Sequence, residues 1–261
     1  MATKIRTNQL KQRLLAGETV YGPFLRLATP AVVEIFGHAG FDFCIIDTEH
    51  GALSVETVEN MVRAAQCAGI TPIVRTSFNT PWMILRALDA GAQGVQVPGV
   101  GTAQEAAAVA RGARFHPEGE RGVCRTTRAA QYSHVPAVDY FPGANHETLV
   151  IIHVEGAAGV ENLDAILAVP GIDLIFLGPY DLSQYLGLTG QVEHPRVIAL
   201  LHELIERIRH ARLCVGIYTD KPERVAYWRE AGVQYIAHGL DTGILYQTAS
   251  NLVAQIRGVK V

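Results

Sequence analysis

Short apolar runs alternate along most of the chain with longer segments whose apolar residues recur at helical spacing. The runs are rich in β-branched residues and are bounded by glycine, proline or polar turn residues, which is the pattern of strands buried on both faces. We interpret eight of them as strands: Val20–Leu27, Phe41–Asp47, Thr71–Arg75, Gly94–Pro98, Val150–Val154, Ile172–Leu177, Leu213–Tyr218 and Gln234–His238.

The segments between these runs have helix signals at both ends. Pro30 opens one helix, and Ser54 is placed to cap another, which Gly69 ends. Eight strands alternating with helices, without a break in composition, predict an α/β fold: a single (β/α)₈ TIM barrel over residues 1–261, preceded by an N-terminal helix. A doubly wound sheet would usually carry a glycine-rich fingerprint after its first strand, and Gly22-Pro23-Phe24 is not one.

One long connection, residues 112–147, interrupts the alternation. It contains several glycines and prolines together with Arg121, Arg125 and Arg128. A connection of this length is more often functional than idle. From the residues alone, we interpret its arginines as a solvated loop face rather than an anion site.

Composition narrows the class of protein. The 261 residues are 49% hydrophobic and 18% charged, which suits one large α/β domain. The 22 Lys and Arg nearly balance the 25 Asp and Glu, so neither nucleic acid nor a membrane is expected as a partner. Four scattered cysteines without a CxxC motif favour reduced thiols, and the first residues lack the apolar core of a signal peptide. We therefore expect a cytoplasmic protein.

Polar residues collect where the predicted strands end, which is where barrel enzymes place their active sites. Two carboxylates, Glu155 and Asp181, follow consecutive strands. Adjacent parallel strands lie about 4.8 Å apart, so these side chains can share one hard divalent cation. The other candidates at strand ends are Asp47, Glu49, His50, Arg75 and His153.

Each candidate also has a purely structural interpretation. Glu155 could be a solvated rim charge, Asp181 an N-cap and His50 a turn residue. Asp89 ends a predicted helix, where a carboxylate is unfavourable against the helix dipole. It therefore needs a partner, and a histidine is a natural one.

Lysines are scarce, and this bears on the chemistry. The chain has only Lys4, Lys11, Lys221 and Lys260, and none falls at the inward end of a predicted strand. A Schiff-base mechanism needs a lysine inside the barrel. Metal-assisted chemistry is thus the better route for a carbonyl reaction.

These residues, taken together, resemble the HpcH/HpaI aldolase/citrate lyase family of metal-dependent 2-oxo acid aldolases, and the likeness covers almost the whole chain. Each motif alone is weak, but together they are specific. The segments that carry the resemblance are FDFCIIDTEHG (41–51), PIVR (72–75), LDAGAQGVQVP (88–98), the Arg121-Gly122 loop, the Glu155 strand and GPYDLS (178–183).

The resemblance implies roles for the metal and substrate residues. Glu155 and Asp181 correspond to the family's metal ligands, with Mg²⁺, Mn²⁺ or Co²⁺ as the divalent ion. Arg75 corresponds to the arginine that contacts the carbonyl oxygen of pyruvate. The backbone after Gly178, at Tyr180 and Asp181, would hold the pyruvate carboxylate.

The resemblance also implies the acid–base residues and the assembly. His50 matches the family's base and Asp89 its partner carboxylate. Asp47 and Glu49 match acidic residues beside the site, and His153 lies on the same strand as Glu155. Family members are hexamers built from dimers that exchange their final helix, so we expect a homo-oligomer.

The sequence departs from the family pattern beside the expected metal. Many members carry Gln-Ile-Glu-Thr-Arg where this chain has His153-Val154-Glu155-Gly156-Ala157, and Ala or Asn is frequent at the position of Tyr180. These differences bear on the aldehyde partner more than on the class of reaction.

The expected function is reversible retro-aldol cleavage of a 4-hydroxy-2-oxo acid to pyruvate and an aldehyde. The protein would then be an enzyme, a class II carbon–carbon lyase. Arg121 and Arg125 are candidates for binding the aldehyde end of the substrate. Two alternatives stay open: an acyl-CoA lyase of the citrate-lyase type, and a barrel that binds a 2-oxo acid and metal without turnover.

Overall fold

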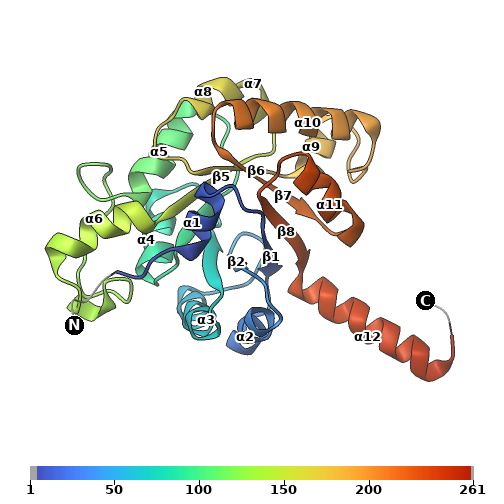
Figure 1. Ribbon diagram of the computed structural model, residues 1–261, viewed down its shortest axis with the longest axis horizontal. Coiled ribbons are helices and arrows are strands. Elements are labelled where there is room, and N and C mark those ends of the chain that lie inside the picture. Colours follow the sequence, from blue (N-terminus) through green and yellow to red (C-terminus); the bar gives the residue numbers. More distant parts are fainter. Residues whose placement is uncertain (1–4, 260–261) are drawn as a thin grey trace.

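Eight parallel strands close into a barrel in which spatial order follows chain order (Figure 1). This is the arrangement in a computed structural model that describes residues 5–259. It confirms the predicted (β/α)₈ barrel. The strands are β1 (Val20–Leu25), β2 (Phe43–Asp47), β3 (Thr71–Arg75), β4 (Gly94–Val97), β5 (Leu149–Val154), β6 (Leu174–Leu177), β7 (Cys214–Thr219) and β8 (Tyr235–Leu240).

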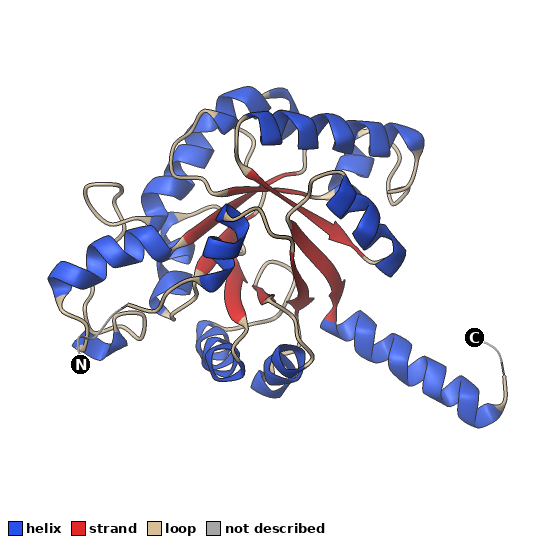
Figure 2. Cartoon of the chain, in the orientation of Figure 1, coloured by secondary structure: helices blue, strands red, loops and turns tan. Residues whose placement is uncertain are grey.

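Helices surround the ring of strands, and one helix lies across an end of the barrel, as Figure 2 shows. They are α1 (Gln9–Leu15), α2 (Pro30–His38), α3 (Val55–Ala68), α4 (Pro81–Asp89), α5 (Ala103–Ala113), α6 (Ala137–Glu147), α7 (Ala157–Glu161), α8 (Leu163–Leu167), α9 (Pro179–Tyr185), α10 (Pro195–His210), α11 (Pro222–Glu230) and α12 (Asp241–Arg257), with a short 3₁₀ turn at Gln131–Ser133.

Two apolar layers hold the barrel together. The outward side chains of the strands pack against the surrounding helices, and the inward side chains, among them Phe43, Ile151 and Tyr235, fill the barrel itself. Leu10 and Leu14 of α1 join the inner layer, so this helix closes the end where the strands begin. The opposite end, where the strands finish, is left for polar residues.

The 112–147 connection contains structure that the sequence pattern did not predict. Helix α6 occupies its second half although Pro142 and Gly143 lie inside the helix, and these two residues concealed the helical pattern. Tyr140 of α6 packs against Phe115, so the segment has a small apolar core of its own. It is therefore an ordered part of the fold rather than a plain loop.

Helix α12 leaves the barrel and extends away from it (Figure 1). It carries large exposed apolar side chains, including Leu245, Tyr246 and Ile256. No helix among residues 5–259 combines the length and the apolar character needed to cross a membrane. Residues 1–4 and 260–261, which include Lys4 and Lys260, lie outside the described residues. The prediction of a single domain over residues 1–261 stays a prediction.

Candidate active site

A cavity of about 390 Å³ opens where the strands end. Side chains from both halves of the barrel converge on it, including most of the residues predicted from the sequence. Its lining consists of Phe24, Arg26, His50, Arg75, His153, Glu155, Phe176, Gly178, Pro179, Tyr180, Asp181, Tyr218 and Leu240.

Asp47 and Arg75 form the most buried charged pair of the site. They occupy paired positions on the neighbouring strands β2 and β3. Arg75 donates from Nε and Nη2 to the two oxygens of Asp47, at 2.8 and 2.7 Å. Burial alone would raise the pKa of the Asp47 carboxyl, but hydrogen bonds from Arg75 and Arg26 hold it at about 2. Asp47 is therefore a fixed anion that orients the Arg75 guanidinium.

Glu49 and His50 continue from Asp47 over the mouth of the cavity. Arg75 Nη1 lies 2.9 Å from Glu49 Oε2, and His50 Nε2 lies 3.8 Å from the same oxygen. The His50 side chain is 57% exposed and lines the cavity. Burial raises the pKa of Glu49 against the lowering effect of Arg75. The predicted base is thus present in the cavity, next to a carboxylate.

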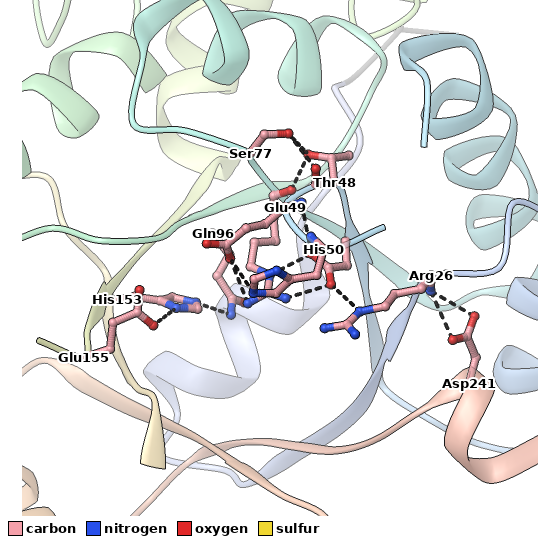
Figure 3. Close-up of polar contacts among 11 residues, drawn as sticks. Arg26, Thr48, Glu49, His50, Ser77, Gln96, His153, Glu155 and Asp241 are labelled. Atoms are coloured by element: carbon pink, nitrogen blue, oxygen red, sulfur yellow. Dashed lines mark hydrogen bonds and ion pairs between the residues drawn. The ribbon is translucent and has the colours of Figure 1, made fainter. Parts of the chain in front are cut away.

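A buried chain of hydrogen bonds positions Glu155 (Figure 3). Tyr235 donates its hydroxyl to Gln96 Oε1, so the Gln96 amide nitrogen is the group that faces His153 Nε2, at 2.6 Å. His153 then carries its proton on Nδ1 and donates it to Glu155 Oε2 at 2.8 Å. With both ring nitrogens engaged, His153 positions the carboxylate and has no lone pair left for a metal.

The second oxygen of Glu155 is fixed as well. Glu155 Oε1 accepts a hydrogen bond from the backbone N–H of Gly99 at 2.9 Å. Burial would raise the pKa of Glu155, but its interactions with His153 and the Gly99 N–H bring it to about 2. The carboxylate is therefore ionised and rigidly held.

Glu155 and Asp181 face one another across Gly178. A Cβ atom on Gly178 would lie 3.0 Å from Glu155 Oε2 and 3.2 Å from Asp181 Oδ2, so only glycine leaves the space between the two oxygens free. Partial burial and the negative charge of Glu155 raise the pKa of Asp181. Two like charges held this close favour a cation between them.

The two carboxylates fit a hard divalent ion. The described part of the chain contains no group of three or more His, Cys, Asp and Glu side chains placed to hold a metal. An ion here would take two protein oxygens and leave its other positions to water and substrate, as Mg²⁺ does in many enzymes. Glu155 and Asp181 are thus the ligands that the structure offers.

Tyrosines form the wall of the cavity next to Asp181. The Tyr180 hydroxyl donates to Asp220 Oδ2 at 2.9 Å, and its ring centroid lies 6.2 Å from that of Tyr218. Burial and the neighbouring Asp220 raise the pKa of Tyr180 to about 12. Tyr180 is therefore a neutral side chain held in place beside the predicted metal ligands.

Within one chain, Asp89 and His50 are not brought together. Asp89 ends α4, near the start of β4 and so at the opposite end of the barrel, and its Oδ1 lies 2.7 Å from Arg121 Nη2. Arg121 is 2% exposed and stacks over the ring of Phe115, with 4.5 Å between guanidinium carbon and ring centroid. It is a buried ion-pair partner, which corrects its assignment to a solvated loop face.

A second and larger cavity, of about 530 Å³, adjoins Arg121 and Arg128 at that end of the barrel. Arg128 donates to Gln66 Oε1 at 2.5 Å, so it too is engaged with the fold, whereas Arg125 is exposed. Most of the residues predicted at the strand ends line the smaller cavity. In one chain, neither Arg121 nor Arg125 reaches the predicted aldehyde end.

Arg26 lines the cavity but was missed in the sequence. Its Nε donates to Asp47 Oδ2 at 2.8 Å. The apolar run Val20–Leu27 was predicted to be strand throughout. Arg26 is the one charged residue in this run, and that charge was the signal that could have identified it as a cavity residue. Of the lysines, Lys11 and Lys221 pair with Asp173 and Glu193, and neither lines this cavity.

Known proteins of one family match this chain over most of its length. The model of the HpcH/HpaI aldolase/citrate lyase family matches residues 21–248. The chain is 36% identical over 249 residues to hydroxypyruvate/pyruvate aldolase of Roseobacter denitrificans, covering 95% of this chain and 96% of that one. It is also 36% identical to 4-hydroxy-2-oxo-heptane-1,7-dioate aldolase of Shigella sonnei, covering 95% and 94%.

Solved structures match over a similar length. A HpcH/HpaI aldolase/citrate lyase family protein from Burkholderia cenocepacia superposes with a TM-score of 0.91 at 35% identity, covering 96% of this chain and all of that one. The citrate synthase SbnG superposes with a TM-score of 0.87 at 32% identity, covering 96% and 98%.

Proposed function

Because the chain belongs to the HpcH/HpaI aldolase/citrate lyase family, we propose that it is a carbon–carbon lyase that cleaves a 4-hydroxy-2-oxo acid reversibly to pyruvate and an aldehyde. One observation carries the proposal. Two carboxylates converge across Gly178 in a cavity that also contains His50 and Arg75. This set combines a cation site, an anion-stabilising guanidinium and a base.

Glu155 and Asp181 would hold the divalent cation, Mg²⁺, Mn²⁺ or Co²⁺, all of which accept oxygen ligands. When bound, the cation supplies Lewis-acid charge next to the 2-oxo group of the substrate. The chain of hydrogen bonds through His153 fixes one carboxylate in advance. Binding the ion therefore costs little reorganisation of Glu155.

Arg75 stabilises the negative charge that develops on the 2-oxo oxygen when the carbon–carbon bond breaks. A guanidinium has five N–H donors, and the contacts with Asp47 and Glu49 use three of them. The remaining N–H groups are available to substrate in a fixed plane. The backbone N–H groups of Tyr180 and Asp181 lie in the first turn of α9, where no helical backbone carbonyl accepts them, and they suit the substrate carboxylate.

His50 accepts the proton of the 4-hydroxyl group. The C3–C4 bond then breaks, C4 becomes the aldehyde carbon, and the electron pair forms the enolate of pyruvate, which gains a proton at C3. His50 is exposed to the cavity and lies near Glu49, so it can exchange its proton with solvent between steps.

We also propose that the protein is a homo-oligomer that docks α12 on a second copy, with a hexamer as the family expectation. The exposed Leu245, Tyr246 and Ile256 support this, because large exposed apolar side chains on a projecting helix are typical of a protein–protein interface. The Asp89–His50 pairing implied by the family would then require a second copy, since one chain keeps these residues at opposite ends of the barrel. Such an assembly and a cytoplasmic location stay predictions.

A citrate-type condensation is the second candidate, favoured by the likeness to SbnG. It shares enolate chemistry with the aldolase but uses a 2-oxo acid as the acceptor. Two activity assays separate these candidates: an aldolase cleaves 4-hydroxy-2-oxo acids, whereas a citrate-type enzyme forms a tricarboxylate. The acyl-CoA lyase and the non-catalytic barrel are separated from both by the next experiment.

The decisive test is exchange of the pyruvate methyl protons in heavy water, followed by NMR. We expect exchange that requires added Mg²⁺, Mn²⁺ or Co²⁺, stops with chelator and is lost in Glu155→Ala. Glu206→Ala, on the exposed face of α10, is the matched control. Absence of exchange with every metal would refute the pyruvate aldolase and leave the acyl-CoA lyase or the non-catalytic barrel.

A further inference from the structure

We propose that Arg26 selects aldehydes that carry a carboxylate at the end remote from the aldehyde group. The inference rests on the proposed function, because it places that aldehyde in the same cavity. It assigns the aldehyde end of the substrate to a residue that follows β1 rather than to the arginines of the 112–147 connection.

The backbone at Arg26 is held from the side opposite the cavity. The carboxylate of Asp241, the buried first residue of α12, accepts the N–H of Arg26 at 3.1 and 3.0 Å and the N–H of Leu27 at 2.8 Å. Figure 3 shows Asp241 beside the backbone of Arg26, with the guanidinium extending away from Asp241. The residue is thus anchored before any ligand arrives.

The side chain is anchored at one point and free at its tip. Arg26 Nε donates to Asp47 Oδ2, while neither Nη atom has a hydrogen-bond partner among residues 5–259. The side chain is 32% exposed and lines the cavity. Two terminal nitrogens of one guanidinium match the two oxygens of a carboxylate.

Asp47 cannot also engage those free nitrogens. Its oxygens already accept from Arg75, from Arg26 Nε and from the backbone N–H groups of Glu49 and His50. One buried carboxylate is therefore shared between two guanidinium groups. The terminal N–H groups of Arg26 are left for a ligand.

The position of Arg26 around the barrel matches the far end of the substrate. β1 lies four strands from β5, so Arg26 stands across the cavity from Glu155. A substrate whose 2-oxo acid end lies at Glu155 and Asp181 would extend its other end toward β1. Arg75, the other arginine in the lining, is bonded to Asp47 and Glu49, and its remaining N–H groups are already assigned to the 2-oxo oxygen at the opposite end of the substrate.

The test compares a charged aldehyde with its neutral counterpart in pyruvate addition: 4-oxobutanoate and butanal. Loss of a hydrogen bond between charged groups lowers binding affinity by roughly 10- to 100-fold. We expect Arg26→Gln to lower the ratio of kcat/KM for 4-oxobutanoate over butanal by that factor, and Arg26→Lys to recover part of it. Arg196→Gln, an exposed arginine of α10, is the matched control.

An equal loss for both aldehydes would mean that Arg26 acts only through Asp47 and would overturn the inference. A selective loss in Arg125→Gln instead would assign the carboxylate to the loop. Calorimetric titration with 4-oxobutanoate tests the same contact without turnover, and an unchanged Kd in Arg26→Gln overturns it. Failure of the aldolase itself shows separately, as absent pyruvate proton exchange in the unmodified protein.

Discussion

Asp47 and Arg75 end two neighbouring strands, and both carboxylate oxygens of Asp47 accept hydrogen bonds from the Arg75 guanidinium. The strand register puts the two residues side by side, and burial makes the contact strong. The face of Phe24 packs on the guanidinium, with 4.7 Å between its carbon and the ring centroid. These contacts hold the Arg75 guanidinium in one orientation, as its proposed role beside a developing negative charge requires.

Arg75→Lys keeps the charge but cannot make the paired contact with Asp47. We expect pyruvate proton exchange to fall by roughly 10²- to 10³-fold, the usual loss on removing one preorganised donor. Exchange rates measured at saturating metal test this. Arg86→Lys, an exposed arginine of α4, is the control, and an Arg75→Lys rate equal to its rate would contradict the assigned role.

The buried Asp47 makes stability depend on acid pH. Its pKa is about 2 in the folded protein, below the ordinary 3.8. A lowered folded-state pKa favours folding above the unfolded value, and this contribution disappears as the pH falls from about 4 to about 2. Its size is on the order of 2 kcal/mol.

Urea unfolding at several pH values tests the dependence. We expect the free energy of unfolding of the unmodified protein to fall more steeply between about pH 4 and pH 2 than that of Asp47→Asn. The surface variant Asp139→Asn should keep the original slope. Parallel slopes for all three proteins would show that Asp47 is not a strongly ionised group in the fold.

The barrel could be predicted because its evidence is local. The sequence of a strand buried on both faces is a short apolar run, and few folds accommodate eight such runs separated by helices. Glu155 and Asp181 could be paired for the same reason, since they follow consecutive strands. The carboxyl ends of β1 and β8 lie about two residues from their predicted positions, because the apolar pattern does not mark where strand pairing stops.

What the sequence did not reveal depends on contacts between distant segments. Arg121 looks like a solvated loop residue until Phe115 and Asp89 are seen to enclose it. The hydrogen-bond chain from Tyr235 to Glu155 joins three strands that no local pattern links. Arg26 was hidden inside an apolar run whose strand ends one residue earlier.

The Asp89–Arg121 pair is structural within the chain, and this can be measured. Arg121 is 2% exposed and Asp89 21%, so removing the carboxylate leaves a buried guanidinium without a counter-ion. We expect Asp89→Asn to lower the free energy of unfolding by roughly 3–5 kcal/mol. Arg121→Met should cost less, because the remaining Asp89 can reach water.

Denaturation curves of both variants beside Asp139→Asn check this order. An Asp89→Asn protein as stable as the unmodified one would show that the pair contributes nothing to the fold. If such a protein had also lost cleavage activity, Asp89 would be assigned to chemistry in a neighbouring copy instead.

Tyr180 limits the width of the cavity beside the predicted metal ligands. Its ring lines the cavity and its hydroxyl is tied to the exposed Asp220, so the ring cannot swing aside without losing a hydrogen bond. We expect Tyr180→Ala to raise kcat/KM for benzaldehyde relative to acetaldehyde by roughly tenfold, the scale on which pocket size discriminates. Tyr180→Phe keeps the ring but loses the hydrogen bond to Asp220, so it should raise this ratio much less than Tyr180→Ala does.

Tyr185→Ala is the matched control, because Tyr185 lies on the same helix and does not line the cavity. The two alanine variants separate the effect of the ring from the effect of altering α9. An equal rise in both would mean that loosening the helix, rather than opening the wall, admits the larger aldehyde. A rise confined to Tyr180→Ala identifies the residue that replaces the family's smaller side chains as a determinant of aldehyde size.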